Sequence, residues 1–392
     1  MKKTLTYSLV LFSVAALSIL IMVGNQQPQK PNMIIIVTDN QGYGDVGFNG
    51  NQMIQTPVLD SLAKHNIIID RFYSFPQNSY SYESLITGKY ASTISEKPDG
   101  TPIPILTLTE ILENNQYQIG VFESGNPKIP ANHQSSNSCN EFHAAAKGAS
   151  SQEITDSLMH FIRQSSSPFF ALLAFHTSPA LDSVPDEIAG KYRLMSLDEQ
   201  TSRTYAFFET TDYHIGKIFE SLENKGILEN TIVVYLSSNG PDALRFNNGL
   251  KGRKGQLDEG SVRVPMILSY PNGKFKAQRI ESFAGSMLDI TPTLLSLATI
   301  TFDSTAFDGI NLTRFLNNPQ TKFPDRALFF HLLSTTKDDS CVAIRQNNFL
   351  LTYHQGDTAL YNLYTDPYQR ANIKTTNKIV FKTLLKTYEQ WK

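Results

Sequence analysis

Three apolar, strand-like segments of this sequence each end in polar side chains that could do chemistry. Asp39 and Asn40 follow the first segment, His176 follows the second, and Ser238 and Asn239 follow the third. In an open α/β sheet, the loops at the carboxyl ends of the strands hold the reactive groups. These five residues are therefore the first candidates for a functional site.

Two serines, Ser79 and Ser81, add hydroxyl groups that a hydrolase could use as nucleophiles. Together with Asp39 and His176 they would make a rearranged hydrolytic site. The alternative role of both serines is structural, because serine readily caps helices and bonds turns. A single histidine after a strand is likewise more often structural than catalytic.

Strand-like and helix-like segments alternate along most of the chain. Continuous apolar, β-branched runs predict strands that are buried on both faces of a parallel sheet. The predicted strands cover residues 33–38, 118–122, 169–175 and 231–236, and the predicted helices cover residues 56–66, 108–115, 156–163 and 205–225. This alternation predicts a doubly wound, mostly parallel α/β sheet with helices on both faces.

From about Arg326 onward the segments become shorter. Short strands are predicted at residues 327–331, 341–345, 349–353 and 359–363, and a final helix is predicted to end at Trp391. The pattern predicts a small antiparallel sheet and a helix. The expected boundaries are 31–325 for the α/β domain and 326–392 for a small C-terminal α+β subdomain.

The N-terminal segment predicts export. Lys2 and Lys3 precede twenty uncharged, mostly apolar residues, 5–24, and residues 25–30 form a polar linker. Twenty residues just span a bilayer, whereas a signal-peptide core is usually shorter and ends at a small-x-small site. We therefore favour a signal anchor at residues 1–24 over a cleaved signal peptide. The body is expected to be membrane-anchored and extracytoplasmic, with a secreted protein as the alternative.

Composition fits a globular protein and excludes the usual nucleic-acid binder. Of the 392 residues 41% are hydrophobic and 18% charged, the net charge is −2, and no Lys/Arg-rich run occurs. Cys139 and Cys341 lie outside any CxxC pair, which excludes a zinc knuckle or a disulfide scaffold. One long-range disulfide and two separate thiols both fit this spacing.

Eight motifs occur in the order found in sulfatases, and together they cover about residues 31–392. The loop 38–47 resembles the family's opening motif, in which a strand ends in two aspartates and leads into Gly-Tyr-Gly-Asp. Residues 254–265 are a near-complete copy of another family signature. The other matches are Thr56–Ala63, Leu85–Tyr90, Thr107–Tyr117, Asp212 with Gly216, Asp289–Leu295 and Leu360–Pro367. The chain is thus identified as a member of the sulfatase family, which implies an alkaline-phosphatase-like fold.

The nucleophile segment departs from the family pattern. Sulfatases convert a Cys or Ser in a Cys-x-Pro-x-Arg segment to formylglycine, whose hydrate attacks sulfur. In the matching segment, Asn78 takes the place of the nucleophile and Tyr82 takes the place of the Arg. An amide can neither be converted nor attack, and the charge that would stabilise the alkoxide is absent.

The resemblance also implies a calcium site, at which two of three expected carboxylates are replaced. Asp39 matches the first ligand, Asn40 and Ser238 stand where aspartates are expected, and Asn239 is retained. Ligand charge sets calcium affinity, so weak or no binding is expected. Asp45 could compensate, although the family pattern gives it a structural role. No cofactor is therefore expected, and calcium would be the metal if any is bound.

The groups that grip sulfate and protonate the leaving group are replaced as well. Ser124 and Asn126 stand where the family has Lys and His, and Pro179 stands where it has a second His. Lys254 is the retained cation. With metal and sulfate absent, we expect Asp39 and Lys254 to bond directly or through water, since an unpaired buried charge is costly. The remaining pocket would be polar but nearly uncharged.

These replacements favour an inactive family member, a pseudosulfatase with a ligand- or partner-binding role outside the cytoplasm. Its ligand would be a sulfated or phosphorylated small molecule or glycan, and its protein partner an active sulfatase homologue. One alternative is a working sulfuric or phosphoric ester hydrolase that uses the rearranged site. Another is a structural or assembly protein with no ligand in the old cleft.

Overall fold

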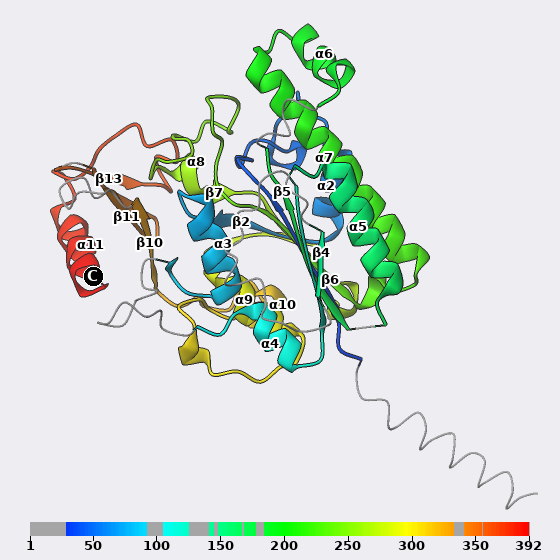
Figure 1. Cartoon of the computed structure of the whole chain (residues 1–392). Helices are drawn as coiled ribbons and strands as arrows, with labels where there is room; N and C mark the ends of the chain where they lie inside the picture. The colour runs from blue at the N-terminus through cyan, green and yellow to red at the C-terminus, as the bar shows by residue number, and fades with distance from the viewer. Residues whose placement is uncertain are drawn as a thin grey trace, which may run out of the picture.

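The parallel strands in the middle of the chain build one large sheet, and the C-terminal strands build a second, small one (Figure 1). The computed structural model describes residues 29–91, 105–124, 141–144, 148–166, 168–177, 184–332, 341–354 and 356–391. The predicted anchor, residues 1–24, lies outside these ranges, as do Asn126, Cys139 and Pro179. No helix within the described ranges is long and apolar enough to cross a membrane.

The large sheet has β1 (Asn32–Thr38) at its centre, between β5 (Phe169–Phe175) and β6 (Thr231–Ser237), and all three strands are parallel and fully buried. Among the described residues the strand order is β4-β3-β5-β1-β6-β8-β2-β7, with β9 paired to β2. The other strands are β2 (Ile67–Tyr73), β3 (Gln118–Glu123), β4 (Glu141–Ala144), β7 (Arg263–Val264), β8 (Met266–Ser269) and β9 (Gln278–Ser286). The sheet is mixed, because β7 and β8 run antiparallel to their neighbours.

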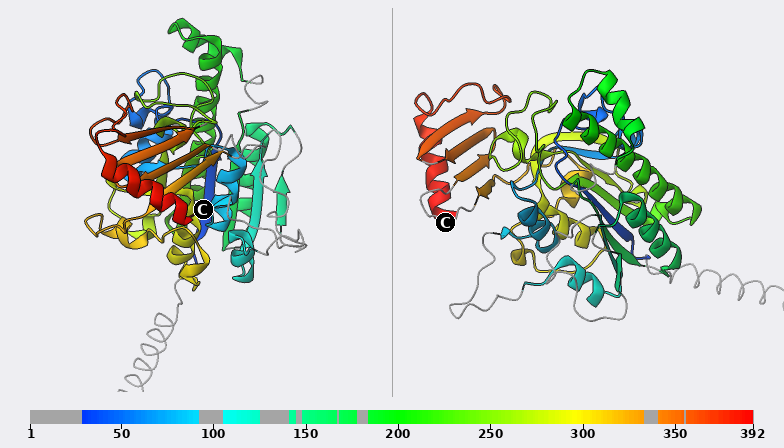
Figure 2. Two further views of the ribbon diagram at one scale, coloured as in Figure 1. Left: turned by 90° about the vertical axis from the view of Figure 1, so that its left-hand side faces the viewer. Right: turned by 45° about the horizontal axis from the view of Figure 1, so that its top comes forward.

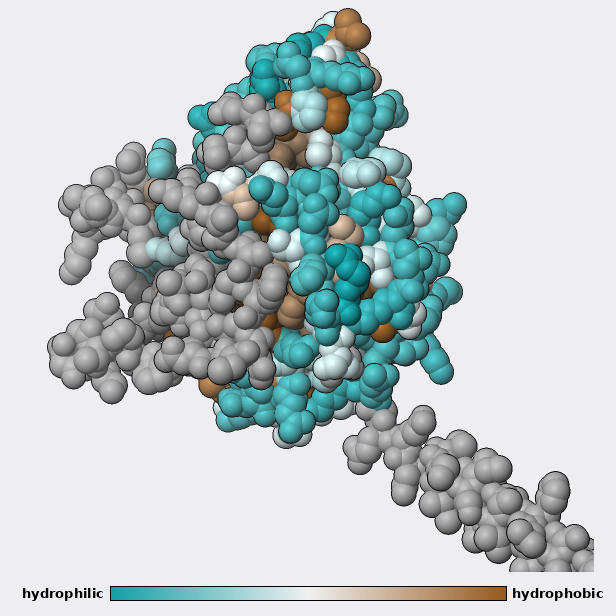
Figure 3. All heavy atoms as spheres, turned by 45° about the vertical axis from the view of Figure 1, so that its right-hand side comes forward, coloured by the Kyte–Doolittle hydropathy of each residue, from teal (hydrophilic) through white to brown (hydrophobic). Residues whose placement is uncertain are grey.

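Helices cover both faces of this sheet, as predicted (Figures 1 and 2). One face packs against α2 (Pro57–His65), α5 (Ser151–Gln164), α6 (Asp186–Leu194) and α7 (Glu199–Asn224), and the other against α3 (Asn78–Thr87), α4 (Leu108–Asn114), α9 (Ile290–Leu297) and α10 (Thr313–Asn317). Within β1, Ile34 and Ile36 join the first core, and Met33, Ile35 and Val37 join the second. This alternation is the two-residue period of a strand buried on both faces. The outer surface on the side of α5 and α7 is mostly hydrophilic (Figure 3).

The small sheet is antiparallel and has the order β10-β11-β12-β13. Its strands are β10 (Ala327–Leu332), β11 (Cys341–Gln346), β12 (Phe349–His354) and β13 (Asp357–Asn362), and the helix α11 (Lys378–Trp391) follows them. The Trp391 ring stacks on the Phe329 ring, with centroids 4.4 Å apart. The ring centroids of Phe330 and of Tyr73, which belongs to the large sheet, are 6.0 Å apart. The predicted C-terminal sheet and helix are therefore confirmed, and they share a core with the α/β domain.

Cys341 is buried in β11, and its Sγ lies 2.6 Å from His354 Nδ1.

The sequence analysis did not predict β2, β4, β7, β8 or β9, of which β2 and β9 are the long strands. Both long strands contain charged residues, namely Asp70 and Arg71 in β2 and Arg279 and Glu281 in β9. These residues interrupt the apolar run on which the prediction of strands depended. Ion pairs account for part of this charge, because Arg263 and Arg279 both pair with Asp70.

A buried ion pair connects the α/β domain to the segment that leads into β10. Both oxygens of Asp289 accept hydrogen bonds from Arg326, and the same carboxylate accepts from the backbone N–H groups of Ser286 and Ile310. Asp289 is fully buried. We predict that Asp289→Ala lowers the free energy of unfolding by about 3–5 kcal/mol, because it leaves the Arg326 guanidinium buried without its carboxylate. Urea unfolding followed by circular dichroism measures the change.

The matched control for this prediction is Glu281→Ala, which removes an exposed carboxylate from β9. A surface change of this kind is expected to stay within about 0.5 kcal/mol. Equal effects of the two substitutions would contradict the importance of the Asp289–Arg326 pair.

Candidate functional site at the carboxyl ends of the central strands

The strand order β3-β5-β1-β6 places four polar residues in a row at one edge of the large sheet. Glu123 ends β3, His176 follows β5, Asp39 follows β1, and Ser238 follows β6. Each of the four is 0% exposed. Backbone hydrogen bonds keep the loops in register beyond the strand ends, since Asp39 N donates to Phe175 O and Ser238 N donates to Thr38 O. Adjacent strands therefore bring together side chains that are far apart in the sequence.

His176 lies between two carboxylates, because β5 lies between β1 and β3. Its Nδ1 is 2.8 Å from Asp39 Oδ2, and its Nε2 is 3.0 Å from Glu123 Oε1. Hydrogen bonds to a charged group are stronger than those between neutral groups. The imidazole thus links two buried acids within the sheet edge, and both of its ring nitrogens face a carboxylate.

The second oxygen of Asp39 faces hydroxyl groups. Ser238 Oγ donates to Asp39 Oδ1 at 2.6 Å, and Tyr82 OH donates to the same atom at 3.1 Å. Burial, together with the nearby Asp39 carboxylate, raises the pKa of Tyr82 well above its ordinary value, so the phenol stays neutral and donates. The Tyr82 ring also packs edge-on against the His176 ring, with centroids 5.9 Å apart.

Asn78, at the predicted nucleophile position, is the first residue of α3 and is 8% exposed. Its Nδ2 donates to Ser238 Oγ at 3.1 Å, and its Oδ1 accepts from Asn239 Nδ2 at 3.2 Å. The predicted nucleophile and metal positions are therefore in direct contact. The serines are placed differently, because Ser79 is exposed and the Ser81 hydroxyl donates to the Ser238 backbone carbonyl.

Asn40 adopts a left-handed backbone conformation with φ of 58°, which asparagine tolerates better than most residues. Its Oδ1 accepts from Lys254 Nζ at 2.8 Å, and its Nδ2 donates to Thr177 Oγ1 at 2.7 Å. The structure thus brings the retained cation to the site through Asn40. The expected bond between Lys254 and Asp39 stays a prediction.

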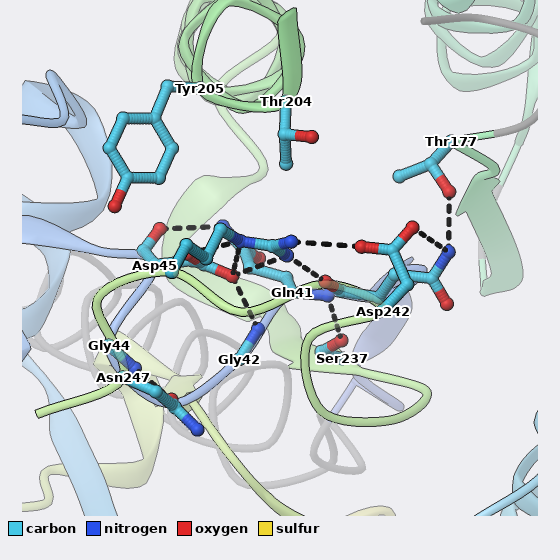
Figure 4. A network of polar contacts seen from close by, with 12 residues as sticks. Gln41, Gly42, Gly44, Asp45, Thr177, Thr204, Tyr205, Ser237, Asp242 and Asn247 are labelled. Carbon is cyan, nitrogen blue, oxygen red and sulfur yellow. Dashed lines mark hydrogen bonds and ion pairs between the residues drawn. The ribbon is translucent and has the colours of Figure 1, made fainter. Parts of the chain in front are cut away.

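Arg245 forms a second polar network beside Asn40. Figure 4 shows this network, in which Asp45 and Asp242 are labelled. The Arg245 side chain is 1% exposed; it bonds both oxygens of Asp45, donates to Asp242 Oδ1 at 2.9 Å and donates to the Asn40 carbonyl at 2.6 Å. Burial raises the pKa of Asp45, and Arg245 opposes that shift. The idea that Asp45 compensates for lost metal ligands is therefore weakened, because its carboxylate is engaged by the guanidinium.

The residues at the predicted calcium positions do not fit a calcium ion. Calcium takes 6–8 oxygen ligands, usually including several carboxylates. Asp39 supplies the only carboxylate of the four positions; its Oδ1 accepts from Ser238 and Tyr82, and its Oδ2 contacts His176 Nδ1. Asn40 Oδ1 accepts from an ammonium group, and Asn239 Oδ1 accepts from Asn40 N at 3.2 Å. In the part of the chain that the structure describes, no group of three or more His, Cys, Asp or Glu is arranged to hold a metal ion.

Ser124 is the remaining candidate among the described residues. Ser124 Oγ accepts from the His176 backbone N–H at 2.9 Å, so it supports the loop after β5. Asn126 and Pro179 lie outside the described residues.

Sequence reasoning missed Glu123 and Arg245 as site residues. An acid at the end of an apolar strand was a usable signal for Glu123, whereas Arg245 lies in none of the motifs.

Two family profiles together match residues 31–390 of this chain. The profile of the family described as "Sulfatase" matches residues 31–300, and the profile described as "N-sulphoglucosamine sulphohydrolase, C-terminal" matches residues 253–390. The chain is 26% identical over 364 residues to the N-acetylgalactosamine-6-sulfatase of Mus musculus, covering 78% of this chain and 69% of that protein. It is 24% identical over 412 residues to an ulvan-active sulfatase of Formosa agariphila, covering 91% of this chain and 79% of that protein.

Solved structures show the same fold. The crystal structure of Ps i-CgsB in complex with k-i-k-neocarrahexaose superposes with a TM-score of 0.77 at 24% sequence identity, covering 93% of each chain. A phosphonate monoester hydrolase of Agrobacterium radiobacter superposes with a TM-score of 0.71 at 16% identity, covering 92% of this chain and 95% of that one. The predicted alkaline-phosphatase-like α/β fold is thus confirmed.

His176 is predicted to stabilise the site electrostatically. We expect His176→Ala to lower the free energy of unfolding by about 3–5 kcal/mol, because the two buried carboxylates that contact the imidazole then face each other across a cavity. Adding Glu123→Gln to this variant removes one of the charges. The double variant should therefore be more stable than His176→Ala in urea unfolding.

The control is His65→Ala, which changes an exposed histidine at the end of α2 and should alter stability by less than about 0.5 kcal/mol. A double variant that is no more stable than His176→Ala would argue against the electrostatic role and leave only packing.

Proposed function

This chain belongs to the sulfatase family, and we propose that it is a catalytically inactive member, a pseudosulfatase that binds a ligand or partner outside the cytoplasm. The observation that carries the proposal is the environment of Asp39. This carboxylate takes hydrogen bonds from Ser238 and Tyr82 on one oxygen and contacts His176 through the other. Both oxygens of the one carboxylate at the predicted calcium positions thus have partners within the protein, which supports the proposal.

The missing groups matter in combination. Without a nucleophile at position 78, the covalent route is absent. Of the cationic groups in the family pattern, the Arg, Lys and His positions are replaced, and Lys254 is the one that the sequence retains. Loss of a single donor of this kind costs about 100- to 1000-fold in rate. Several such losses together would bring any residual activity down to background.

The proposed ligand is a sulfated glycan or a related sulfated or phosphorylated small molecule. Support comes from the relatives, one of which is described as ulvan-active and another of which was solved with a neocarrahexaose. An active sulfatase homologue is the proposed protein partner, should the chain act through assembly. The N-terminal segment would anchor the protein in a membrane, with its body on the extracytoplasmic side.

A rearranged hydrolase has less support from the geometry. Ser79 is exposed on the first turn of α3, and Ser81 is buried with its hydroxyl on backbone groups. Both ring nitrogens of His176 face carboxylates, whereas a general base needs one nitrogen directed at its nucleophile.

We predict no turnover of aryl sulfates or aryl phosphates above background. The full-length chain, purified in mild detergent, is assayed beside Ser79→Ala and beside an active arylsulfatase prepared in the same way. Equal, background rates for the chain and Ser79→Ala are expected. Activity that is present in the chain and lost in Ser79→Ala would overturn the proposal in favour of the rearranged hydrolase.

Calcium is predicted not to bind tightly, because one carboxylate among four positions leaves too little ligand charge. Calorimetric titration of the full-length chain with calcium chloride should give no saturable heat at micromolar concentrations. Asp39→Asn is the matched control, since it removes the single remaining carboxylate. A micromolar site that disappears in Asp39→Asn would show that the metal site still works.

A further inference from the structure

A second polar pocket lies away from the Asp39 site, where the large sheet meets the C-terminal subdomain. Its volume is about 560 Å³, and residues of β2, β9, β10, β11 and the segment 319–326 line it. The Asp39 site, by contrast, is built at the carboxyl ends of β3, β5, β1 and β6. A pocket of about 300–1,000 Å³ is the size that usually holds a small ligand.

Positive charge dominates the lining of this pocket. Arg71, Lys322, Arg326 and Arg345 contribute to it, and the described lining residues include no aspartate or glutamate. Asp289 neutralises Arg326 from outside the pocket. The charges of the other three side chains face the pocket without an acidic lining residue to balance them.

Arg345 is the most informative of these cations. It is 3% exposed, its Nε donates to Tyr73 OH, and its Nη1 donates to the Asn347 carbonyl at 2.6 Å. No carboxylate among the described residues lies within 4.0 Å of its guanidinium. Other guanidinium groups with little exposure behave differently, since Arg245 pairs with Asp45 and Arg326 pairs with Asp289. Tyr73 OH in turn donates to Glu259 Oε1, so an acidic group is one hydrogen bond removed from Arg345. A buried guanidinium with no carboxylate in direct contact can still accept an external anion as its partner.

Arg71 is a second cation in the lining of this pocket. It lies in β2, is half-buried, and makes no hydrogen bond or ion pair with any described residue. Its donors are therefore available to a ligand in the pocket. Guanidinium groups match the geometry of sulfate and phosphate oxygens, to which they donate two parallel hydrogen bonds.

We propose that this pocket is a binding site for a sulfate or phosphate group, with Arg71 and Arg345 as its principal donors and Lys322 at its rim. The pocket is larger than a bare oxyanion requires, so it has room for a sugar ring that carries the group as an ester. The proposal goes beyond the pseudosulfatase proposal, because it concerns a different pocket and holds whether or not the Asp39 site is active.

Calorimetric titration of the full-length chain at low ionic strength tests the proposal, since salt screens such contacts. The probes are sodium sulfate, sodium phosphate, N-acetylglucosamine 6-sulfate and unmodified N-acetylglucosamine. We expect saturable binding of the anionic probes, weakened about tenfold or more in Arg71→Ala because a charge-assisted hydrogen bond is lost. Lys322→Ala should weaken binding by a smaller factor. The control, Arg163→Ala, removes an exposed arginine from α5 on the far side of the large sheet (Figure 1) and should leave binding unchanged.

The choice of probes separates the sources of the anion. Tighter binding of the sugar sulfate than of inorganic sulfate would support an ester group on a saccharide, and equal binding would support a free oxyanion. Two outcomes would overturn the site: no saturable binding of any anionic probe, or binding that is unchanged in both Arg71→Ala and Lys322→Ala. Neither Arg71 nor Lys322 makes a side-chain hydrogen bond with the described residues, so both variants are expected to fold.

Discussion

The interior of this protein must accommodate acidic groups at the carboxyl ends of its central strands, and that requirement shapes the site. Asp39 and Glu123 are fully buried at the ends of β1 and β3, the two strands that flank β5. Carboxylates removed from water are costly unless donors replace the lost hydration. Ser238 and Tyr82 donate to Asp39 and His176 contacts its other oxygen, so the protein's own side chains provide the partners of this buried carboxylate.

The same principle recurs in the framework around the site. Arg245 engages Asp45, Arg263 and Arg279 share Asp70, and Arg326 engages Asp289. These pairs join the opening loop, strand β2 and the segment before β10 to the body of the α/β domain. Arg345 differs from these within the described residues, because no carboxylate contacts it directly and Glu259 is reached only through Tyr73 OH.

The sequence allowed much of the fold to be predicted and less of the site. The strands β1, β5 and β6 were predictable because each is a continuous apolar run, and α2, α4 and α7 because their apolar residues recur at helical spacing. Strand β2 was not, because Asp70 and Arg71 interrupt its apolar residues and become acceptable only through partners elsewhere in the chain. The motifs indicated Asp39, Asn78, Ser238 and Lys254. They could not indicate that His176 lies between Asp39 and Glu123, since this depends on β5 lying between β1 and β3.

The hydrogen bond from Ser238 to Asp39 determines which side chains position 238 can accept. Ser238 Oγ lies 2.6 Å from Asp39 Oδ1, so an aspartate at this position would remove the donor and set a second buried carboxylate against the first. Two like charges at such a distance disfavour the ionised form of each other. With protein side chains as the partners of Asp39, position 238 therefore selects a neutral donor over a second acid.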